Sequence, residues 1–341
     1  MLRSVYPFAL ATMTPAVMLG IGGVLGSTFW LLLALIYMTV FTFALDLLGG
    51  KGRGVGVDVG GYDTLSVTLA LLHFGLLGLA VATVAQGNGF QSVIAFFAFG
   101  LFFGQVSNSN AHELIHRPTR QLHWLGAWVF ISHLFGHHTS AHRLVHHRYV
   151  ATDADPNSAP MGRSFYAFLI KAWRGSFWGG LAEENQCGAG VNPYLTYIVG
   201  AAVFVAISWW IAGFSGVLAY GLLAVYASTQ ILLSDYVQHY GLRRRVLDGG
   251  KPEPVTDQHT WDSPHRFSGL LMLNAPRHSD HHAHPSRPYP ALTLPNGGPV
   301  LPYSLPVMGF IAWFPGAWRR LMDPRVGALN KLRDEAEKVG L

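Results

Sequence analysis

Six long apolar runs constrain the fold of this 341-residue chain more than any other feature. A helix needs about 20 predominantly apolar residues to cross the ~30 Å hydrocarbon core of a bilayer. A soluble domain carries about 25% charged residues, whereas this chain carries 12% and has a mean hydropathy of +0.30. The sequence therefore predicts an all-α integral membrane protein with transmembrane helices at residues 5–25, 29–48, 65–84, 90–106, 195–211 and 217–233.

The short connections between these runs predict three helical hairpins within a single domain, residues 1–341. The three tips carry no charge: Gly26-Ser27, residues 86–89 and residues 213–216. The basic residues fall in the long connections and in the last segment. Because basic loops stay in the cytoplasm, we expect both termini on that side, together with the histidine-rich regions 107–193 and 234–341.

Two segments near the end of the chain are apolar or basic but do not fit a span. Residues 307–314 are apolar but too few to cross a bilayer, so we expect them at the interface or packed on the bundle. Residues 319–338 predict a basic helix at the membrane surface. The net charge of +5 is spread over loops without a basic block, which argues for contact with anionic lipid and against nucleic-acid binding.

Seventeen histidines point to metal chemistry, and all except His73 lie outside the predicted spans. A lone buried histidine is usually a packing or hydrogen-bonded residue, so His73 is not predicted as a ligand. Most of the other histidines form four clusters near span ends or in the long loops: residues 112–116, 133–147, 235–239 and 277–284. Spacings of three and four residues place imidazoles on one helical face. Four such clusters on one side of a membrane predict a shared metal site.

The second cluster contains the pattern His-x-x-x-His-His twice, and spacing alone does not choose between the copies. One copy is His133, His137 and His138, and the other is His142, His146 and His147. The single cysteine, Cys187, excludes an intrachain disulfide and any thiolate-based metal centre. A redox centre that depends on thiolates must therefore belong to another protein.

The number of histidines favours two metal ions over one. Three or four imidazoles complete one zinc site, whereas eight or nine can hold two ions with open positions, which suits iron and O2 activation. Four carboxylates in or near the clusters are expected to accept hydrogen bonds from ligand rings: Glu113, Asp235, Asp262 and Asp280. HELIH also matches the zinc-protease pattern, but a protease does not need the other clusters. A metal transporter is a further alternative, although its spans would need more polar residues than these contain.

Four segments resemble the histidine boxes of the membrane alkane 1-monooxygenases, within the integral-membrane fatty acid desaturases and hydroxylases. They are HELIHR at 112–117, HRLVHHRYVATDADP at 142–156, YVQHYGL at 236–242 and RHSDHHAHPSRPYPAL at 277–292. The resemblance implies a histidine-bound di-iron enzyme of the bacterial inner membrane that uses O2 to hydroxylate a terminal methyl group. It implies an alkane substrate entering from the lipid bilayer and electrons from rubredoxin and rubredoxin reductase.

The resemblance also implies which histidines are ligands. The Val-Ala-Thr sequence at 150–152 aligns with the family's second box and selects the second copy of the repeated pattern. His137 and His138 then become neighbours of the site or surface residues, and His133 becomes a structural residue. The implied ligands are His112, His116, His142, His146, His147, His239, His278, His281 and His282.

Three positions depart from the family pattern. Ala141 stands where the family usually has Glu, and Asp235 and Gln238 stand where it commonly has Asn and Glu. A glutamine at this place resembles the related xylene monooxygenases, so aromatic methyl groups are an alternative substrate. A fatty acyl desaturase or hydroxylase would share the same histidine spacing. Phenylalanines of the fourth span line the substrate cavity or face lipid and neighbouring helices: Phe96, Phe97, Phe99, Phe102 and Phe103.

Overall fold

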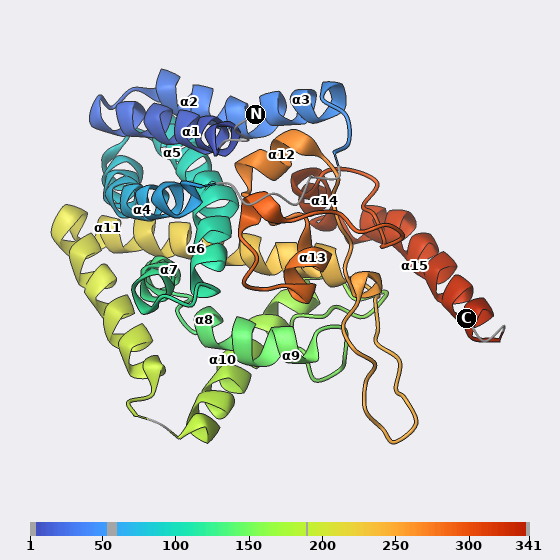
Figure 1. Ribbon diagram of the computed structural model, residues 1–341. Helices are drawn as coiled ribbons and strands as arrows, with labels where there is room; N and C mark the ends of the chain where they lie inside the picture. Colours follow the sequence, from blue (N-terminus) through green and yellow to red (C-terminus); the bar gives the residue numbers. More distant parts are fainter. Residues whose placement is uncertain (1–4, 53–59, 189, 339–341) are drawn as a thin grey trace.

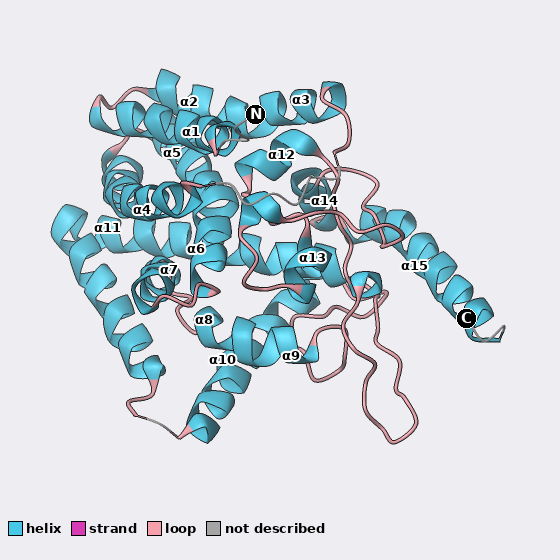
Figure 2. Cartoon of the chain, in the orientation of Figure 1, coloured by secondary structure: helices cyan, strands magenta, loops and turns pink. Residues whose placement is uncertain are grey.

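A computed structural model of the chain describes residues 5–52, 60–188 and 190–338, with the backbone alone at 334 and 336–338. This part of the chain is helices and loops, with three isolated β-bridges and no strand (Figure 2). The all-α prediction is confirmed. Within the described residues, five helices are long and apolar enough to cross a membrane, as in an integral membrane protein: Tyr6–Val24, Thr28–Leu48, Tyr62–Gln86, Gly89–Ile115 and Pro193–His239.

The first two apolar helices form the first predicted hairpin. Helix α1 is Tyr6–Val24, and the second is continuous through α2 (Thr28–Ile36), a π-helical turn (Tyr37–Phe41) and α3 (Thr42–Leu48). Gly26 makes the turn with φ of +60°, a conformation that glycine adopts without steric cost. The two helices lie together at one end of the molecule in Figure 1.

The second pair comprises α4 (Tyr62–Gln86) and a helix that extends nine residues past the predicted end at 106. It runs through α5 (Gly89–Phe102), a π-helical turn (Phe103–Ser107) and α6 (Asn108–Ile115). The polar residues after 106 remain helical because neighbouring helices satisfy their side chains. The amide of Asn108 donates to the Ala227 carbonyl at 2.8 Å, and that of Asn110 donates to the Ser66 carbonyl at 2.8 Å.

The fifth and sixth predicted spans lie on the two limbs of one 47-residue element, α11 (Pro193–His239). Ala212 and Gly213 leave the helical conformation, and the limbs diverge from that point (Figure 1). The break begins at the predicted tip, but the chain after Gly213 returns to helix at once. Because the two limbs form one element, the arrangement of six spans in three hairpins remains a prediction.

The region 107–193 is more helical than its polar composition indicates. It contains α7 (Arg120–Ser132), α8 (His138–Ala141), a π-helical turn (His142–His146), α9 (His147–Tyr149) and α10 (Phe165–Cys187). Helix α7 has 13 residues, about 20 Å at 1.5 Å per residue, which is too short to span a bilayer. It buries Val129, Phe130 and Ile131 instead and packs on α6.

The region after α11 covers one side of the bundle. It comprises a 3₁₀ turn (Asp257–His259), α12 (Arg266–Leu271), α13 (His278–Ala283), a second 3₁₀ turn (Tyr289–Ala291), α14 (Leu305–Ala312) and α15 (Pro315–Lys338). Helix α14, predicted to lie at the interface or on the bundle, packs against α11. Helix α15 confirms the predicted terminal helix and buries Trp318, Met322 and Val326 along one side.

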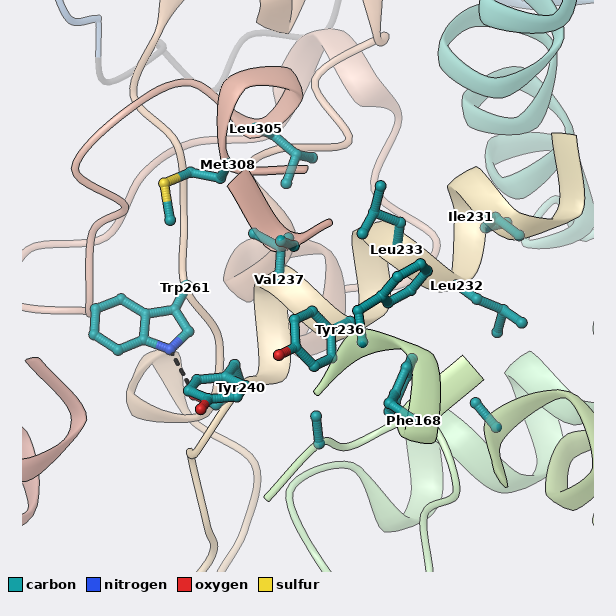
Figure 3. Close-up of a cluster of buried hydrophobic side chains, with 14 of the residues drawn as sticks. Phe168, Ile231, Leu232, Leu233, Tyr236, Val237, Tyr240, Trp261, Leu305 and Met308 are labelled. Atoms are coloured by element: carbon teal, nitrogen blue, oxygen red, sulfur yellow. Dashed lines mark hydrogen bonds between the residues drawn. The ribbon is translucent and has the colours of Figure 1, made fainter. Parts of the chain in front are cut away.

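A cluster of buried side chains fixes the end of α11. Figure 3 shows Tyr236, Val237 and Tyr240 on its last turns, with Trp261 and Met308 beside them. The indole N–H of Trp261 donates to the Tyr240 carbonyl at 2.9 Å. This packing fixes the end of α11, which carries the buried His239.

Candidate metal centre

All nine histidines that the resemblance implies as ligands come together in two groups. In each group, one nitrogen from every ring lies within 4.8 Å of those of the other rings. The first group is His112, His116, His142, His147 and His281, and the second is His146, His239, His278 and His282. Helices α6, α9 and α13 and the end of α11 converge on this point (Figure 1).

The closest contacts in each group are between Nε2 atoms. In the first group, Nε2 of His142 lies 2.7 Å from that of His112 and 2.9 Å from that of His147. Nε2 of His147 also lies 3.1 Å from that of His281. In the second group, the Nε2 atoms of two α13 histidines are 3.2 Å apart. The rings therefore direct their nitrogens at two common points.

Hydrogen bonds among the rings do not account for this arrangement. A neutral imidazole carries one N–H and one lone pair, so one Nε2 atom does not make good hydrogen bonds to two others at once. Several nitrogens have no partner at all and are buried, including Nε2 of His116, His146 and His239. Clusters of buried, unpartnered imidazole nitrogens fit a divalent transition-metal ion at the centre of each group.

Burial also keeps these rings in the form that binds metal. Desolvation, with neighbouring imidazoles adding to it, lowers the pKa of His142, His147, His281 and His282 well below the ordinary value. A metal ligand must be a neutral imidazole. For these four rings, the environment therefore disfavours the protonated form that would compete with an ion.

A π-helical turn brings His142 and His147 to the same group. Residues five apart lie about 140° apart around an α-helix, on different faces. Here the backbone N–H of His147 donates to the carbonyl of His142, which closes the wider i→i+5 turn. His146 in the same turn points to the second group instead. One box thus supplies ligand candidates to both groups.

Helix α13 also serves both groups within one and a half turns. His281 belongs to the first group, whereas His278 and His282, one turn apart, belong to the second. Asp262 receives the backbone N–H of Ser279 at 2.9 Å and the Ser279 hydroxyl, near the start of this helix. The carboxylate therefore orients α13 through its first turn.

Two rings have acceptors that fix their orientation. Nδ1 of His239 donates to the His259 carbonyl at 3.2 Å, and Nδ1 of His146 lies 2.9 Å from Oδ2 of Asp155. Burial alone would lower the pKa of His146, but the Asp155 carboxylate outweighs it and raises that pKa above the ordinary value. Sequence reasoning missed Asp155, although it stands in the ATDADP continuation of the second box.

The four carboxylates expected to accept from ligand rings have other partners. In the described part of the chain, none of them receives a hydrogen bond from one of the nine rings. Glu113 pairs with Arg117 and accepts the backbone N–H of Tyr289 at 3.1 Å, while Asp235 accepts from the Asn157 amide at 2.7 Å. These acids hold neighbouring segments in place.

Asp280, within α13, also faces away from the rings of the two groups. It lies 3.0 Å from Nδ1 of His284 and accepts the backbone N–H of Thr293 at 2.7 Å. Asp262 and Asp280 therefore connect the fourth box to the chain segments before and after it. The expected role as a direct acceptor was wrong for these carboxylates because backbone, arginine, amide and hydroxyl donors occupy them instead.

The other buried histidines fall outside the two groups. His73 is hydrogen-bonded on both nitrogens, to Ser107 at 3.0 Å and to Ser132 at 2.7 Å. Nδ1 of His133 lies 3.0 Å from the Asn108 side-chain oxygen. Both residues therefore have a structural explanation, in line with the expectation from the sequence.

The first copy of the repeated pattern ends in two residues with different surroundings. His137 packs among aromatic rings and has Nε2 at 3.4 Å from the Ser176 hydroxyl. His138 lies with its ring centroid 5.1 Å from that of His142. The second copy of the pattern therefore supplies members of both groups, whereas the first copy lies beside them.

An apolar cavity of about 680 Å³ approaches the two groups from the bundle. Its walls come from the π-helical turn after α2, from α3, α5, the second limb of α11, and α14. A smaller cavity of about 40 Å³ touches His112, His142 and His278. The two cavities share four lining residues: Gly104, Gln230, Ser234 and Met272. The two cavities therefore adjoin one another, and the smaller one lies between the apolar cavity and the histidines.

The phenylalanines predicted as lining candidates do not line this cavity. Phe99, Phe102 and Phe103 are fully buried in helix packing, while Phe96 and Phe97 contact the ring of Tyr226. Tyr226 on α11 reaches the cavity instead. A stretch of aromatic residues in one helix does not reveal which ring faces the interior, because that depends on the neighbouring helix.

Comparison with known proteins identifies a matching family and several similar proteins. The fatty acid desaturase family model matches residues 88–294, which include all four boxes. Alkane 1-monooxygenase 1 of Alcanivorax borkumensis is 35% identical over 293 residues, covering 80% of this chain and 71% of the relative. Alkane 1-monooxygenase 2 of Pseudomonas aeruginosa is 32% identical, covering 79% and 74%. The xylene/toluene monooxygenase hydroxylase component of Pseudomonas putida is 26% identical, covering 77% and 72%.

Proposed function

Because the chain belongs to the alkane 1-monooxygenases within the fatty acid desaturase family, we propose that it hydroxylates the terminal methyl group of an alkane. Members of this family are O2-dependent monooxygenases, and the long apolar helices make this one membrane-bound. One observation carries the proposal: members of both histidine groups line a small cavity that adjoins a large apolar one.

We propose two iron ions as the cofactor, one in each histidine group. Five imidazoles face the first point and four face the second, which exceeds what a single ion accepts and leaves open positions for O2. Imidazole also binds zinc and copper, so the choice of iron rests on the family and on the chemistry required. Two bound irons would supply the O2 activation and electron transfer that side chains do not provide.

The chain itself supplies position and an apolar environment. A methyl group offers no polar handle, so its placement depends on the shape of the cavity. The walls are largely apolar, with Met38 and Phe43 on one side and Leu305 and Phe310 on the other. Such walls exclude water from the reacting carbon and limit side reactions. The alkane partitions into lipid and enters between the helices.

Electrons must come from another protein, and we propose rubredoxin with rubredoxin reductase. The only cysteine is the exposed Cys187, so the chain has no thiolate-held redox centre. The basic loops favour an orientation with both termini and the histidine regions in the cytoplasm of a bacterial inner membrane. A soluble donor would reach the metal centre from that side.

A second candidate is hydroxylation of aromatic methyl groups. Gln238 is the residue that favours it, since a neutral side chain at this position resembles the xylene monooxygenases. The Gln238 oxygen accepts from the Ser234 hydroxyl at 2.7 Å, and its amide donates to the Ala275 carbonyl at 3.2 Å. It lines the small cavity and therefore lies near the reacting methyl group of either substrate.

Substrate profiling with metal analysis tests the proposal. Membranes containing the chain, supplied with rubredoxin, its reductase and NADH, are offered linear alkanes, alkylbenzenes and fatty acids at equal concentration. We expect 1-alkanols as the main products and about two irons per chain in the purified protein. Faster turnover of xylenes than of any alkane would favour the second candidate. An active preparation holding stoichiometric zinc and no iron would exclude the di-iron centre.

A further inference from the structure

A tenth buried histidine lies beside the two groups and belongs to neither. His138 begins α8, four residues before His142, and only 1% of it is exposed. Neither of its ring nitrogens has a hydrogen-bond partner. His73 and His133 are equally buried, but His73 is hydrogen-bonded on both nitrogens and His133 on one. The environment of His138 therefore lacks an explanation in packing alone.

The ring of His138 is held firmly by its neighbours. It stacks on Phe135 with centroids 5.2 Å apart and meets the edge of Phe130 at 4.9 Å. Two aromatic contacts stabilise the ring plane without offering a strong partner for its nitrogens. A neutral imidazole has one donor and one acceptor, and burying both unpartnered is unfavourable. A partner that is not a side chain would remove this penalty.

His138 lines the small cavity that touches both histidine groups. The cavity of about 40 Å³ is bounded by His112 and His142 of the first group, by His278 of the second, and by His138. A water molecule needs roughly 10–15 Å³ of such space. The cavity therefore has room for a molecule of a few atoms. It also meets the large apolar cavity at Gly104 and Gln230.

We propose that His138 donates a hydrogen bond to a small polar or anionic ligand held in this cavity against the metal centre. The inference rests on the proposed two-ion centre and assigns a residue beyond its nine ligand candidates. His138 acts as a positioning residue, because its nitrogens lie outside both ligand groups. Its fixed ring orients a ligand of one to three atoms at the place where the substrate path ends.

Azide binding to the iron-loaded, detergent-solubilised protein tests the inference. Azide is a three-atom anion whose binding to ferric iron is followed by absorption, independently of turnover. We expect His138→Phe to hold the wild-type amount of iron and to bind azide about tenfold more weakly, since one hydrogen bond to a charged ligand is lost. Phe fits a pocket already lined by Phe130 and Phe135.

Conservative and neighbouring variants separate hydrogen bonding from packing. His138→Asn and His138→Gln place an amide N–H near the positions of Nδ1 and Nε2, and one of them should restore most of the azide affinity. His137→Phe is the matched control, because the adjacent ring lies among Trp173 and Phe177 and does not line the cavity. It should leave azide binding unchanged.

Three results would overturn the inference. The first is wild-type azide affinity in an iron-replete His138→Phe protein. The second is loss of iron from that variant, which would make His138 a ligand. The third is no azide-induced absorption in an iron-replete, active wild-type protein, because the cavity would then be closed to small anions. Purified wild-type protein that contains no iron would instead refute the proposed function. Metal analysis of the wild-type and variant proteins distinguishes that result from the three above.

Discussion

Nδ1 of His146 lies 2.9 Å from Oδ2 of Asp155, and both side chains are fully buried. The carboxylate also accepts the Ser158 hydroxyl at 2.6 Å and the backbone N–H of Asn157 at 3.0 Å. It is therefore rigid, and it directs Nε2 of His146 toward the second histidine group. Carboxylates in this position raise the basicity of a metal-bound imidazole and fix its orientation.

Replacing Asp155 with Asn should weaken iron binding while leaving the fold intact. Asparagine keeps an acceptor for the ring N–H but removes the negative charge, and losses of about 10–100-fold in metal affinity are typical for such changes. Competition with a chelator measures the affinity. Asp153→Asn is the control, since Asp153 is in the same segment and its side chain is 98% exposed. Equal affinities in the two variants would contradict a role for the carboxylate.

The two copies of the repeated histidine pattern should respond differently to mutation. His146→Ala removes a member of the second group and should abolish turnover and reduce the iron content. His133→Ala removes a ring whose Nδ1 bonds to Asn108, so it should lower thermal stability but keep substantial activity. Iron analysis and alkane turnover of both proteins are compared. The opposite pattern would assign the metal to the first copy.

The apolar helices and the convergence of the nine histidines were predictable for definite reasons. Hydrophobic runs of span length leave few alternatives in a membrane, and His112 and His116 have the spacing of one helical turn. His239 and His278 come from distant segments, and their common side of the membrane placed them in one predicted site. The resemblance then selected the nine ligand candidates among the seventeen histidines.

The features that were missed depend on contacts between segments. The π-helical turn that aligns His142 with His147 follows no local signal, because i→i+5 bonding is chosen by the surrounding packing. Asp155 was overlooked since nothing local shows that a loop carboxylate folds back onto His146. Glu113 and Asp280 were given the wrong partners: a nearby arginine pairs with each, and the backbone N–H groups of Tyr289 and Thr293 donate to them.

Replacing Asp262 with Ala should remove both metal ions together. Asp262 satisfies the backbone N–H of Ser279 in the first turn of α13, and losing such a cap costs about 1 kcal/mol. Helix α13 has only six residues and supplies histidines to both groups. We expect iron content to fall without a stable one-iron form. Asp248→Ala, in an exposed loop, is the control, and a variant holding one iron would argue against this coupling.

Adding a methyl group at Gly104 should reshape the junction between the two cavities. A Cβ at this position would lie 2.1 Å from Cδ and Oε1 of Gln230, so the glutamine amide must move. Gln230 lines both cavities and donates to the Gly100 carbonyl at 2.8 Å. Gly104→Ala should therefore reduce kcat/KM for alkanes by about tenfold or more through misplacement of the substrate, with normal iron content.

Two further variants test whether the Gly104 effect arises from this one contact. Gly78→Ala is the matched control, because nothing lies within 4 Å of its added Cβ, and it should behave like the wild type. The double variant Gly104→Ala/Gln230→Ser shortens the displaced side chain and makes room for the methyl group. Part of the lost kcat/KM should therefore return, which would show that the two substitutions are energetically coupled. Wild-type kinetics in Gly104→Ala would mean that substrate reaches the histidines by another path. Iron loss in that variant would mean that the substitution disrupts the metal centre itself.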